Sequence, residues 1–166
     1  MEGVTPDDSA PLFNGPIETG LRSLMLLEAF HPEPLDLERL SLLDYFVVHT
    51  ADIEGPDSLH PKLASNVGEY RIRRRVIEDG INLMRHASLV QVIEDENGVQ
   101  FASADDAPAF IKLLATEYNL DLMARAKWLA EQTSRRGDEF LTHLKDSIDR
   151  WTHEFQYEEA DPGGWS

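Results

Sequence analysis

The sequence predicts a mostly helical α+β fold, in which three helices lead into a two-stranded β-hairpin and further helices follow. Asn97-Gly98 lies between two segments of strand character, and Asn-Gly is the dipeptide most typical of a tight type I′ hairpin turn. Directly before it, residues 69–86 place apolar and polar side chains on opposite sides of a helix of about 100° per residue. Two helical segments precede that helix. The pattern predicts a winged-helix-like core with the hairpin as its two-stranded wing.

Six helices are expected along the chain. Pro16 suits the first turn of the first helix, and Asp36 is a candidate N-cap of the second. The second helix is apolar around most of its circumference, so we expect it to be central and buried. The helical ranges are 17–30, 37–50, 69–86, 109–118, 121–133 and 138–155, with a long irregular segment at 51–67. In the first helix Ile17, Leu21, Leu24, Met25 and Leu27 should face inward, and in the third Ile72, Val76, Ile77, Gly80, Leu83 and Met84.

The length and residue pattern suit one domain with extensions. A chain of 166 residues is long enough for a real core and too short for two comfortable domains. We expect a flexible N-terminal arm at 1–15 and a winged-helix-like domain at 16–103. A C-terminal helical extension packed on that domain follows at 104–156, and a disordered tail at 157–166.

Composition excludes several classes of protein. The chain has no cysteine, which rules out disulfides and cysteine-ligated zinc. It shows no signal peptide and no apolar stretch long enough for a bilayer, so a soluble, cytoplasmic protein without membrane contact is expected. The formal net charge of −16 should repel DNA, since phosphate contacts provide most of the affinity of nucleic-acid binders. A strongly acidic chain instead suits docking onto a basic partner.

Two surfaces are candidates for partner binding. Arg71, Arg74, Arg75 and Arg85 gather on the polar side of the third helix, which predicts a docking surface for an acidic partner; the alternative is an ordinary solvated face. The last helix repeats Leu141, Leu144, Ile148, Trp151 and Phe155 at spacings of three and four. Such a seam packs against one neighbouring helix, either the 121–133 helix of the same chain or, with Leu144 and Trp151 as contacts, a helix of a partner.

Catalytic motifs are missing from the sequence. It contains no glycine-rich phosphate loop, no His-Glu-x-x-His motif and no nucleophile elbow, so we expect neither an enzyme nor a cofactor. His49, Asp52, Asp57 and His60 lie near one another around the irregular segment and offer metal-ligand chemistry. Their spacing matches no standard metal site, and a polar loop is the simpler interpretation, so no metal is expected.

Several stretches together resemble a known family. They are residues 21–61, 68–114 and 124–129, with Leu42-Leu43-Asp44-Tyr45, Ser58-Leu59-His60-Pro61 and the run from Gly68-Glu69 to Arg75 as distinctive pieces. From about Leu21 to Leu129 the chain resembles the middle component (type two) of bacterial ABC-three-component systems, to which the Lamassu-type anti-phage defence systems belong.

The resemblance implies a role that composition does not indicate. In such systems an SMC-like ABC ATPase works with a middle component and an effector, often a nuclease. The middle component would be a non-catalytic adaptor that bridges the ATPase to the effector and holds the effector inactive until foreign or abnormal DNA is sensed. DNA would then be contacted only indirectly, through the complex, and no catalytic residue is implied for this chain.

A DNA-binding protein is the alternative function. It would use Arg71 to Arg75 on the third helix for recognition, with the wing beside the DNA backbone. The wing tip, Glu94-Asp95-Glu96, argues against it, because carboxylates there would repel phosphates.

Overall fold

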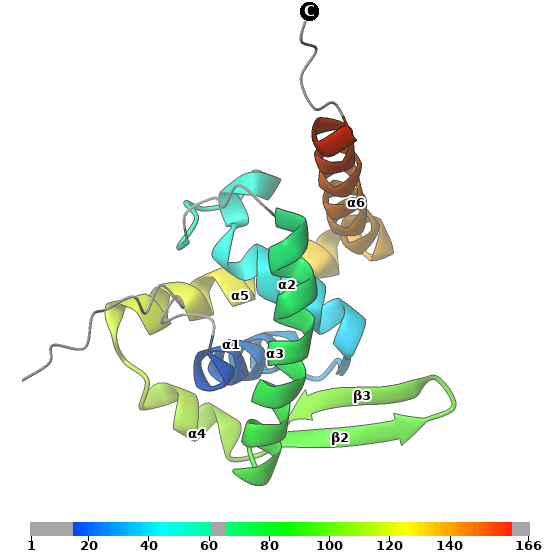
Figure 1. Cartoon of the computed structure of the whole chain (residues 1–166). Helices are drawn as coiled ribbons and strands as arrows, with labels where there is room; N and C mark the ends of the chain where they lie inside the picture. Colours follow the sequence, from blue (N-terminus) through cyan, green and yellow to red (C-terminus); the bar gives the residue numbers. More distant parts are fainter. Residues whose placement is uncertain (1–14, 61–65, 161–166) are drawn as a thin grey trace, which may run out of the picture.

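A computed structural model describes residues 15–60 and 66–160 of the chain, with side chains described for 15–60 and 74–150. Apart from Gly15, the predicted N-terminal arm lies outside the described residues. The elements are α1 (Pro16–Phe30), β1 (Leu35–Asp36), α2 (Leu37–Val48), the 3₁₀ helix η1 (Thr50–Ile53), α3 (Asn66–His86), β2 (Val90–Asp95), β3 (Gly98–Ser103), α4 (Ala107–Lys112), α5 (Glu117–Arg136) and α6 (Asp138–Ala160). The predicted mostly helical α+β class is confirmed (Figure 1).

A small antiparallel sheet pairs the segment between α1 and α2 with the hairpin that follows α3. Its order is β1-β3-β2, so β3 pairs with both other strands. β2 and β3 form the hairpin seen in Figure 1. β1 consists of two residues directly before α2, with Leu35 opposite Phe101. The sequence analysis did not predict β1, because two residues are too few to show the alternation that marks a strand. The order of three helices followed by a hairpin is the one expected for a winged-helix-like core.

The core is built around α2. The predicted N-cap is confirmed, since the Asp36 side chain accepts a hydrogen bond of 2.8 Å from the Arg39 backbone N–H. Every residue from 40 to 50 is buried, which confirms the prediction of a central helix. α1, α3, α5 and α6 all pack against α2. Among the largest fully buried side chains are Tyr45 and Phe46 of this helix.

The hairpin turn differs from the predicted type I′ turn. Asp95 pairs with Gly98, so the two loop residues are Glu96 and Asn97. Gly98 has a φ of 105°, whereas Asn97 is not among the described non-glycine residues with positive φ. The Asp95 side chain accepts a hydrogen bond of 2.8 Å from the Asn97 backbone N–H, which holds the loop in this form. Only the glycine of the Asn-Gly pair therefore needs a left-handed backbone.

The inward faces of α1 and α3 were predicted only in part. Ile17 is 61% exposed, and Leu83 is 45% exposed, so both expectations were wrong. The buried residues of α3 are Ile77, Gly80, Ile81 and Met84. They recur at intervals of three and four residues and therefore form one stripe along the helix. Ile81, which was not predicted, takes the inward place instead of Leu83. The Ile72 side chain lies outside those described.

The helices after the hairpin begin and end at different residues from those expected. α4 stops at Lys112, and α5 begins at Glu117, four residues earlier than predicted. The reason is a cap: the Thr116 side chain accepts a 3.2 Å hydrogen bond from the Asn119 backbone N–H. Gly137, with a φ of 65°, separates α5 from α6, which runs to Ala160, into the range predicted as tail. α5 packs against α1 and α2, and α6 against α2, α3 and α5.

Candidate functional site

The exposed side of α3 carries the predicted basic residues. Arg74, Arg75 and Arg85 are all exposed. On a helix of about 100° per residue they fall within about 100° of one another, on a side whose centre is roughly 120° from that of the buried stripe. The fourth candidate, Arg71, belongs to the first part of α3, where side chains are not described. The structure therefore brings three of the four predicted arginines to one side, and we call Arg74, Arg75 and Arg85 the "basic face" of α3.

Acidic side chains lie on and near the basic face. Glu78 and Asp79 are exposed on α3 itself, so the face is locally mixed in charge although arginine predominates. Glu94, Asp95 and Glu96 are exposed at the tip of the hairpin, which projects from the body beyond the end of α3 (Figure 1). The surface available to a partner thus consists of the basic face of α3 and the acidic tip of the hairpin that follows α3 in the chain.

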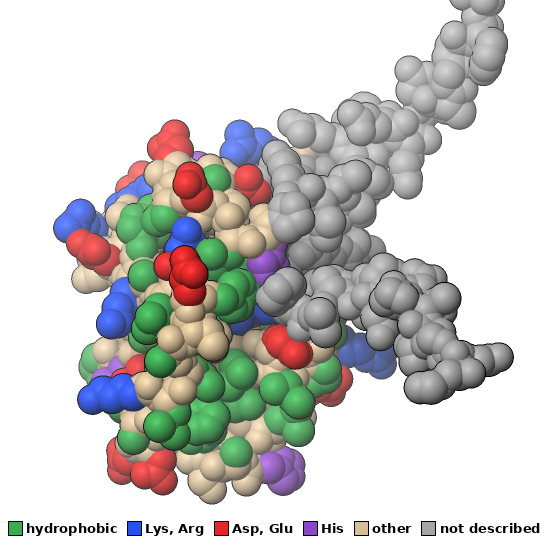
Figure 2. Space-filling model, turned by 90° about the vertical axis from the view of Figure 1, so that its left-hand side faces the viewer, with side chains coloured by type: hydrophobic (Ala, Val, Ile, Leu, Met, Phe, Trp, Pro, Cys, Tyr) green, Lys and Arg blue, Asp and Glu red, His purple; other side chains and the backbone are tan. Residues whose placement is uncertain are grey.

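Another side of the molecule carries exposed apolar residues. Leu113, which directly follows α4, is 80% exposed, and Leu120, in the first turn of α5, is 60% exposed. Figure 2 shows the side of the molecule that lies on the left in Figure 1, where hydrophobic side chains are interspersed with charges of both signs. This side therefore offers no surface of a single charge.

The candidate seam of α6 lies partly inside the chain. Leu144 is fully buried, and Phe140 and Ile148 are buried beside it in the same core. Since α6 packs on α2, α3 and α5, these side chains stabilise the packing of α6 within the chain. Leu144 therefore has no exposed surface of its own for a partner. The other candidate on this helix, Trp151, lies outside the residues whose side chains are described.

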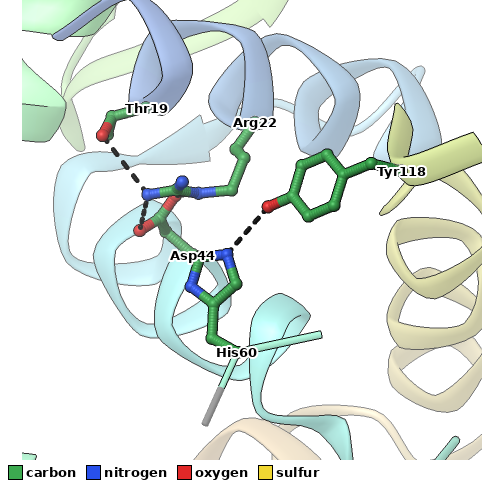
Figure 3. A network of polar contacts seen from close by, with 5 residues as sticks. All are labelled: Thr19, Arg22, Asp44, His60 and Tyr118. Carbon is green, nitrogen blue, oxygen red and sulfur yellow. Dashed lines mark hydrogen bonds and ion pairs between the residues drawn. The ribbon is translucent and has the colours of Figure 1, made fainter. Parts of the chain in front are cut away.

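The most polar part of the core is a buried ion pair between α1 and α2. The Arg22 Nε donates to Asp44 Oδ1 at 3.0 Å, and Nη2 donates to Asp44 Oδ2 at 3.4 Å and to Thr19 Oγ1 at 3.3 Å (Figure 3). The side chains of Arg22 and Asp44 are 2% and 0% exposed. Each charge thus has an opposite charge and hydrogen bonds inside the protein, the condition under which buried charges are tolerated.

The surroundings of Arg22 keep it charged. Burial alone would lower its pKa, because a low-dielectric interior disfavours the charged form. The carboxylate of Asp44 acts in the opposite direction through its charge and its hydrogen bond, with a further contribution from Tyr118. The net result is that the pKa of Arg22 is raised above its ordinary value.

Two histidines and two tyrosines extend this polar region toward α5. The His60 Nε2 and the Tyr118 hydroxyl are hydrogen-bonded at 2.8 Å (Figure 3). The ring of the buried His49 lies 4.6 Å from the Tyr45 ring and 6.2 Å from the His60 ring, between centroids. The cluster therefore links α2, α5 and the segment after η1. Its rings contact one another and do not converge on a common point.

The metal-ligand alternative finds no support in this geometry. Among the side chains described, those of residues 15–60 and 74–150, no three of the His, Asp or Glu type are arranged so that they could hold a metal ion together. Asp57 is exposed, whereas His49 is buried. Asp57 is linked to its neighbours through its backbone carbonyl, which accepts hydrogen bonds from Arg125.

The sequence analysis did not single out Arg22, Tyr118 or Arg125. A signal was present for the ion pair: Arg22 interrupts an apolar helix, Asp44 interrupts the next one, and the two charges are opposite. Charges inside apolar helices are almost never buried unless they are paired. No comparable signal exists for Tyr118 and Arg125, because both lie on an ordinary amphipathic helix.

Fold and surface together define a small, mostly helical α+β protein with a three-stranded antiparallel sheet and an exposed arginine-bearing helix. The family model described as ABC-three component (ABC-3C) system Middle Component 2 matches residues 12–154, and the chain belongs to this family. It is therefore a middle component of a multi-subunit system. No curated protein and no solved structure matches the chain. In the described part of the chain, none of the helices has the length and apolar character that crossing a membrane requires.

Proposed function

We propose that this chain is a non-catalytic adaptor subunit that bridges an SMC-like ABC ATPase to its effector, often a nuclease, and regulates that effector in a Lamassu-type anti-phage defence complex. The observation that carries the proposal is the basic face of α3 on an otherwise acidic chain. Membership of a middle-component family supports it, since a middle component works with companion subunits.

Charge explains why this face would bind a protein. Lysine and arginine together number 15 against 31 aspartates and glutamates, so the exposed arginines of α3 are opposite in sign to most charged side chains of the chain. Arginine is enriched at protein interfaces, because its planar guanidinium pairs with carboxylates through two hydrogen bonds at once. An acidic segment of a companion subunit is the partner that Arg74, Arg75 and Arg85 suit best.

Charge reversal tests the docking role. The variant Arg71→Glu, Arg74→Glu, Arg75→Glu should lose the companion subunits during co-purification from its operon, as followed by size-exclusion chromatography with mass determination. Because Arg74 and Arg75 are exposed, the isolated variant should unfold at the same urea concentration as the wild type.

A matched control separates local from general charge effects. Lys112→Glu, Lys127→Glu, Arg135→Glu reverses three exposed cations on α4 and α5 and changes the net charge equally. This control should assemble normally. Co-purification of the α3 variant at the level of the control would contradict the proposal.

DNA binding is the second candidate function, favoured by the arginines on the third helix before a hairpin. The exposed carboxylates at residues 94–96 oppose it, because a hairpin beside a phosphate backbone would bring like charges together. A fluorescence titration with duplex DNA at several salt concentrations distinguishes the two functions. Affinity of the isolated chain that falls steeply with salt would favour DNA binding, and the proposed adaptor should show no measurable affinity at physiological salt.

A further inference from the structure

One backbone edge of β2 has no neighbouring strand among the described residues. β3 lies in the middle of the sheet, so β2 is paired on one side only. The hairpin that β2 forms with β3 projects from the body of the protein (Figure 1). Backbone groups on such an edge are a template for pairing with another polypeptide strand. The outer edge of β2 is therefore a candidate binding surface.

The register of the hairpin identifies the backbone groups that point outward. In an antiparallel pair, opposite residues alternate between pairs that exchange both backbone hydrogen bonds and pairs that exchange none. Asp95 and Gly98 enclose the two-residue loop and form a hydrogen-bonded pair, because a β-turn is closed between its first and fourth residues. Counting back from Asp95, every second residue of β2 bonds to β3. The outward-directed N–H and C=O groups belong to the residues in between, Val90, Val92 and Glu94.

The outer part of this edge is available, whereas its base is not. Directly before β2, the Leu89 backbone N–H donates to the Met84 carbonyl at 2.9 Å, and the side chain of Val90 is buried. Farther out, Val92 and Glu94 make no backbone hydrogen bond outside the hairpin within the part of the chain that the structure describes. The available edge therefore begins at Val92 and extends toward the tip of the hairpin.

The side chains around the available edge are apolar or acidic. Ile93 is exposed, and so is Val99, which lies opposite Glu94 on β3. Glu94 and Asp95 are exposed beside them. β-Branched side chains pack well on the pleated surface of a sheet, and opposite charges on neighbouring strands attract each other. The edge thus suits an extended segment that carries both apolar and basic side chains.

The order of residues along β2 specifies the order of side chains in such a segment. Successive side chains of a strand point to opposite faces, so Val92 and Glu94 share one face, and Ile93 and Asp95 share the other. On both faces the apolar residue is nearer the body and the carboxylate is nearer the tip. A segment antiparallel to β2 therefore matches the edge when two basic residues are followed by two β-branched apolar residues.

We propose that the outer edge of β2 binds an extended segment of a companion subunit by strand addition, with basic side chains of the segment opposite Glu94 and Asp95. In this mode of recognition, backbone hydrogen bonds provide affinity and the side chains provide selectivity. A second copy of this chain suits the edge less, because its β2 carries the same two carboxylates. The inference rests on the proposed function only in that a companion subunit supplies the segment.

NMR titration of the isolated full chain with the synthetic peptide Thr-Lys-Lys-Val-Val-Thr tests the edge itself. The amide signals of Val92 and Glu94 should shift and reach saturation, because their N–H groups acquire acceptors, and amides in the middle of α2 should not move. The peptide Thr-Glu-Glu-Val-Val-Thr should bind at least about tenfold more weakly, since two attractive pairs become repulsive. Equal binding of both peptides, or no shift at millimolar lysine peptide, would overturn the proposal.

Two variants of β2 separate the backbone from the charges. Val92→Pro removes an outward N–H and places a ring on the edge, whereas the bonds to β3 come from the neighbouring residues and remain. It should abolish binding of the lysine peptide, and the matched control Val92→Thr, which keeps the N–H, should retain it. Glu94→Lys, Asp95→Lys leaves the backbone unchanged and should reverse the preference, so that the glutamate peptide binds better. An unchanged preference would overturn the role of the two carboxylates.

Co-purification with the companion subunits of the same operon tests the source of the segment. Glu94→Lys, Asp95→Lys should reduce the amount of bound subunit at least about threefold. The control Asp146→Lys, Asp149→Lys reverses two exposed carboxylates of α6 and should assemble normally. Equal assembly of both variants would mean that no companion subunit supplies the segment, and the inference would be wrong. Failure of the docking function of α3 shows separately, in the α3 reversal, which leaves β2 unchanged.

Discussion

Gly20 of α1 and Gly80 of α3 face each other where the two helices cross. A Cβ on Gly20 would be 2.8 Å from the Gly80 carbonyl oxygen, and a Cβ on Gly80 would be 2.6 Å from the Gly20 nitrogen. The neighbouring atoms are backbone atoms, which cannot turn away as a flexible side chain would. The two glycines therefore set how closely α3, with its basic face, approaches the body of the protein.

Gly80→Ala should destabilise the fold although alanine is the better helix former. The gain in helix propensity is about 1 kcal/mol, whereas forcing a methyl group between two backbones costs about 1–3 kcal/mol and separates the helices. Urea unfolding should show a lower midpoint than the wild type. Asn82→Ala, an exposed site on the same helix, should be neutral or slightly stabilising. Equal stability of both variants would contradict the close crossing.

Arg22→Met should lower the free energy of unfolding by about 3–5 kcal/mol, because it removes the ion-pair partner of a fully buried carboxylate. The double variant Arg22→Met, Asp44→Leu should recover much of this loss, since no buried charge remains. Thermal unfolding of the wild type, the single variants Arg22→Met and Asp44→Leu, and the double variant checks the coupling. Additive losses in the double variant would show that the two side chains act independently.

The pH dependence of the stability that this ion pair contributes follows from the direction in which the pKa of Arg22 is shifted. The pKa of Arg22 is raised in the folded state, chiefly because Asp44 outweighs the effect of burial. Its stabilising contribution is therefore complete below the ordinary pKa of arginine and is lost only as the pH rises through the folded value. Between about pH 6 and 9 the difference in stability between wild type and the double variant Arg22→Met, Asp44→Leu should therefore stay constant, because this variant keeps no buried carboxylate that could titrate.

Gly98→Ala should destabilise the hairpin by about 1–2 kcal/mol, because its φ of 105° is unfavourable for any residue with a Cβ. Asn97→Ala should change stability by less than about 0.5 kcal/mol, since Asn97 has no positive φ and contributes its backbone N–H to the turn. Chemical unfolding of both variants distinguishes the observed turn from a type I′ turn. An equally large loss in Asn97→Ala would indicate the latter.

Leu144→Asp should lower the melting temperature strongly, because a charge would be placed in the fully buried core between α6 and its neighbours. Thr142→Asp, exposed two residues earlier on the same helix, should melt close to the wild type. Calorimetry of the isolated wild type and the two variants measures these melting temperatures. A normal melting temperature of Leu144→Asp together with loss of the companion subunits would mean that Leu144 faces a partner.

Local signals in the sequence were sufficient for most of the fold. Pro16, the Asp36 cap and the apolar second helix each depend on neighbours in the chain, and each prediction is confirmed. The inward side of α3 was predicted less well. Which of several apolar residues turns inward depends on the crossing with α1, and the crossing is set by Gly20, which lies sixty residues away.

The candidate site could likewise be predicted only in part from the sequence. The exposed arginines of α3 could be predicted, because a charge pattern on one helix is visible in the sequence. The contacts of the loop at residues 54–60 could not, because Tyr118, Arg125 and Trp128 reach this loop from a distant part of the chain. Contacts between a backbone carbonyl and a distant side chain leave no pattern in either segment.

The sheet order has a consequence for the behaviour of the chain in solution. With β3 in the middle, β2 has no neighbouring strand on its other edge among the described residues, and a second copy could add to the backbone groups there. The outer end of β2 carries Glu94 and Asp95, both exposed. Charged side chains on an edge strand oppose its pairing with a second copy. The hairpin can thus extend into solvent without acting as a seed for aggregation.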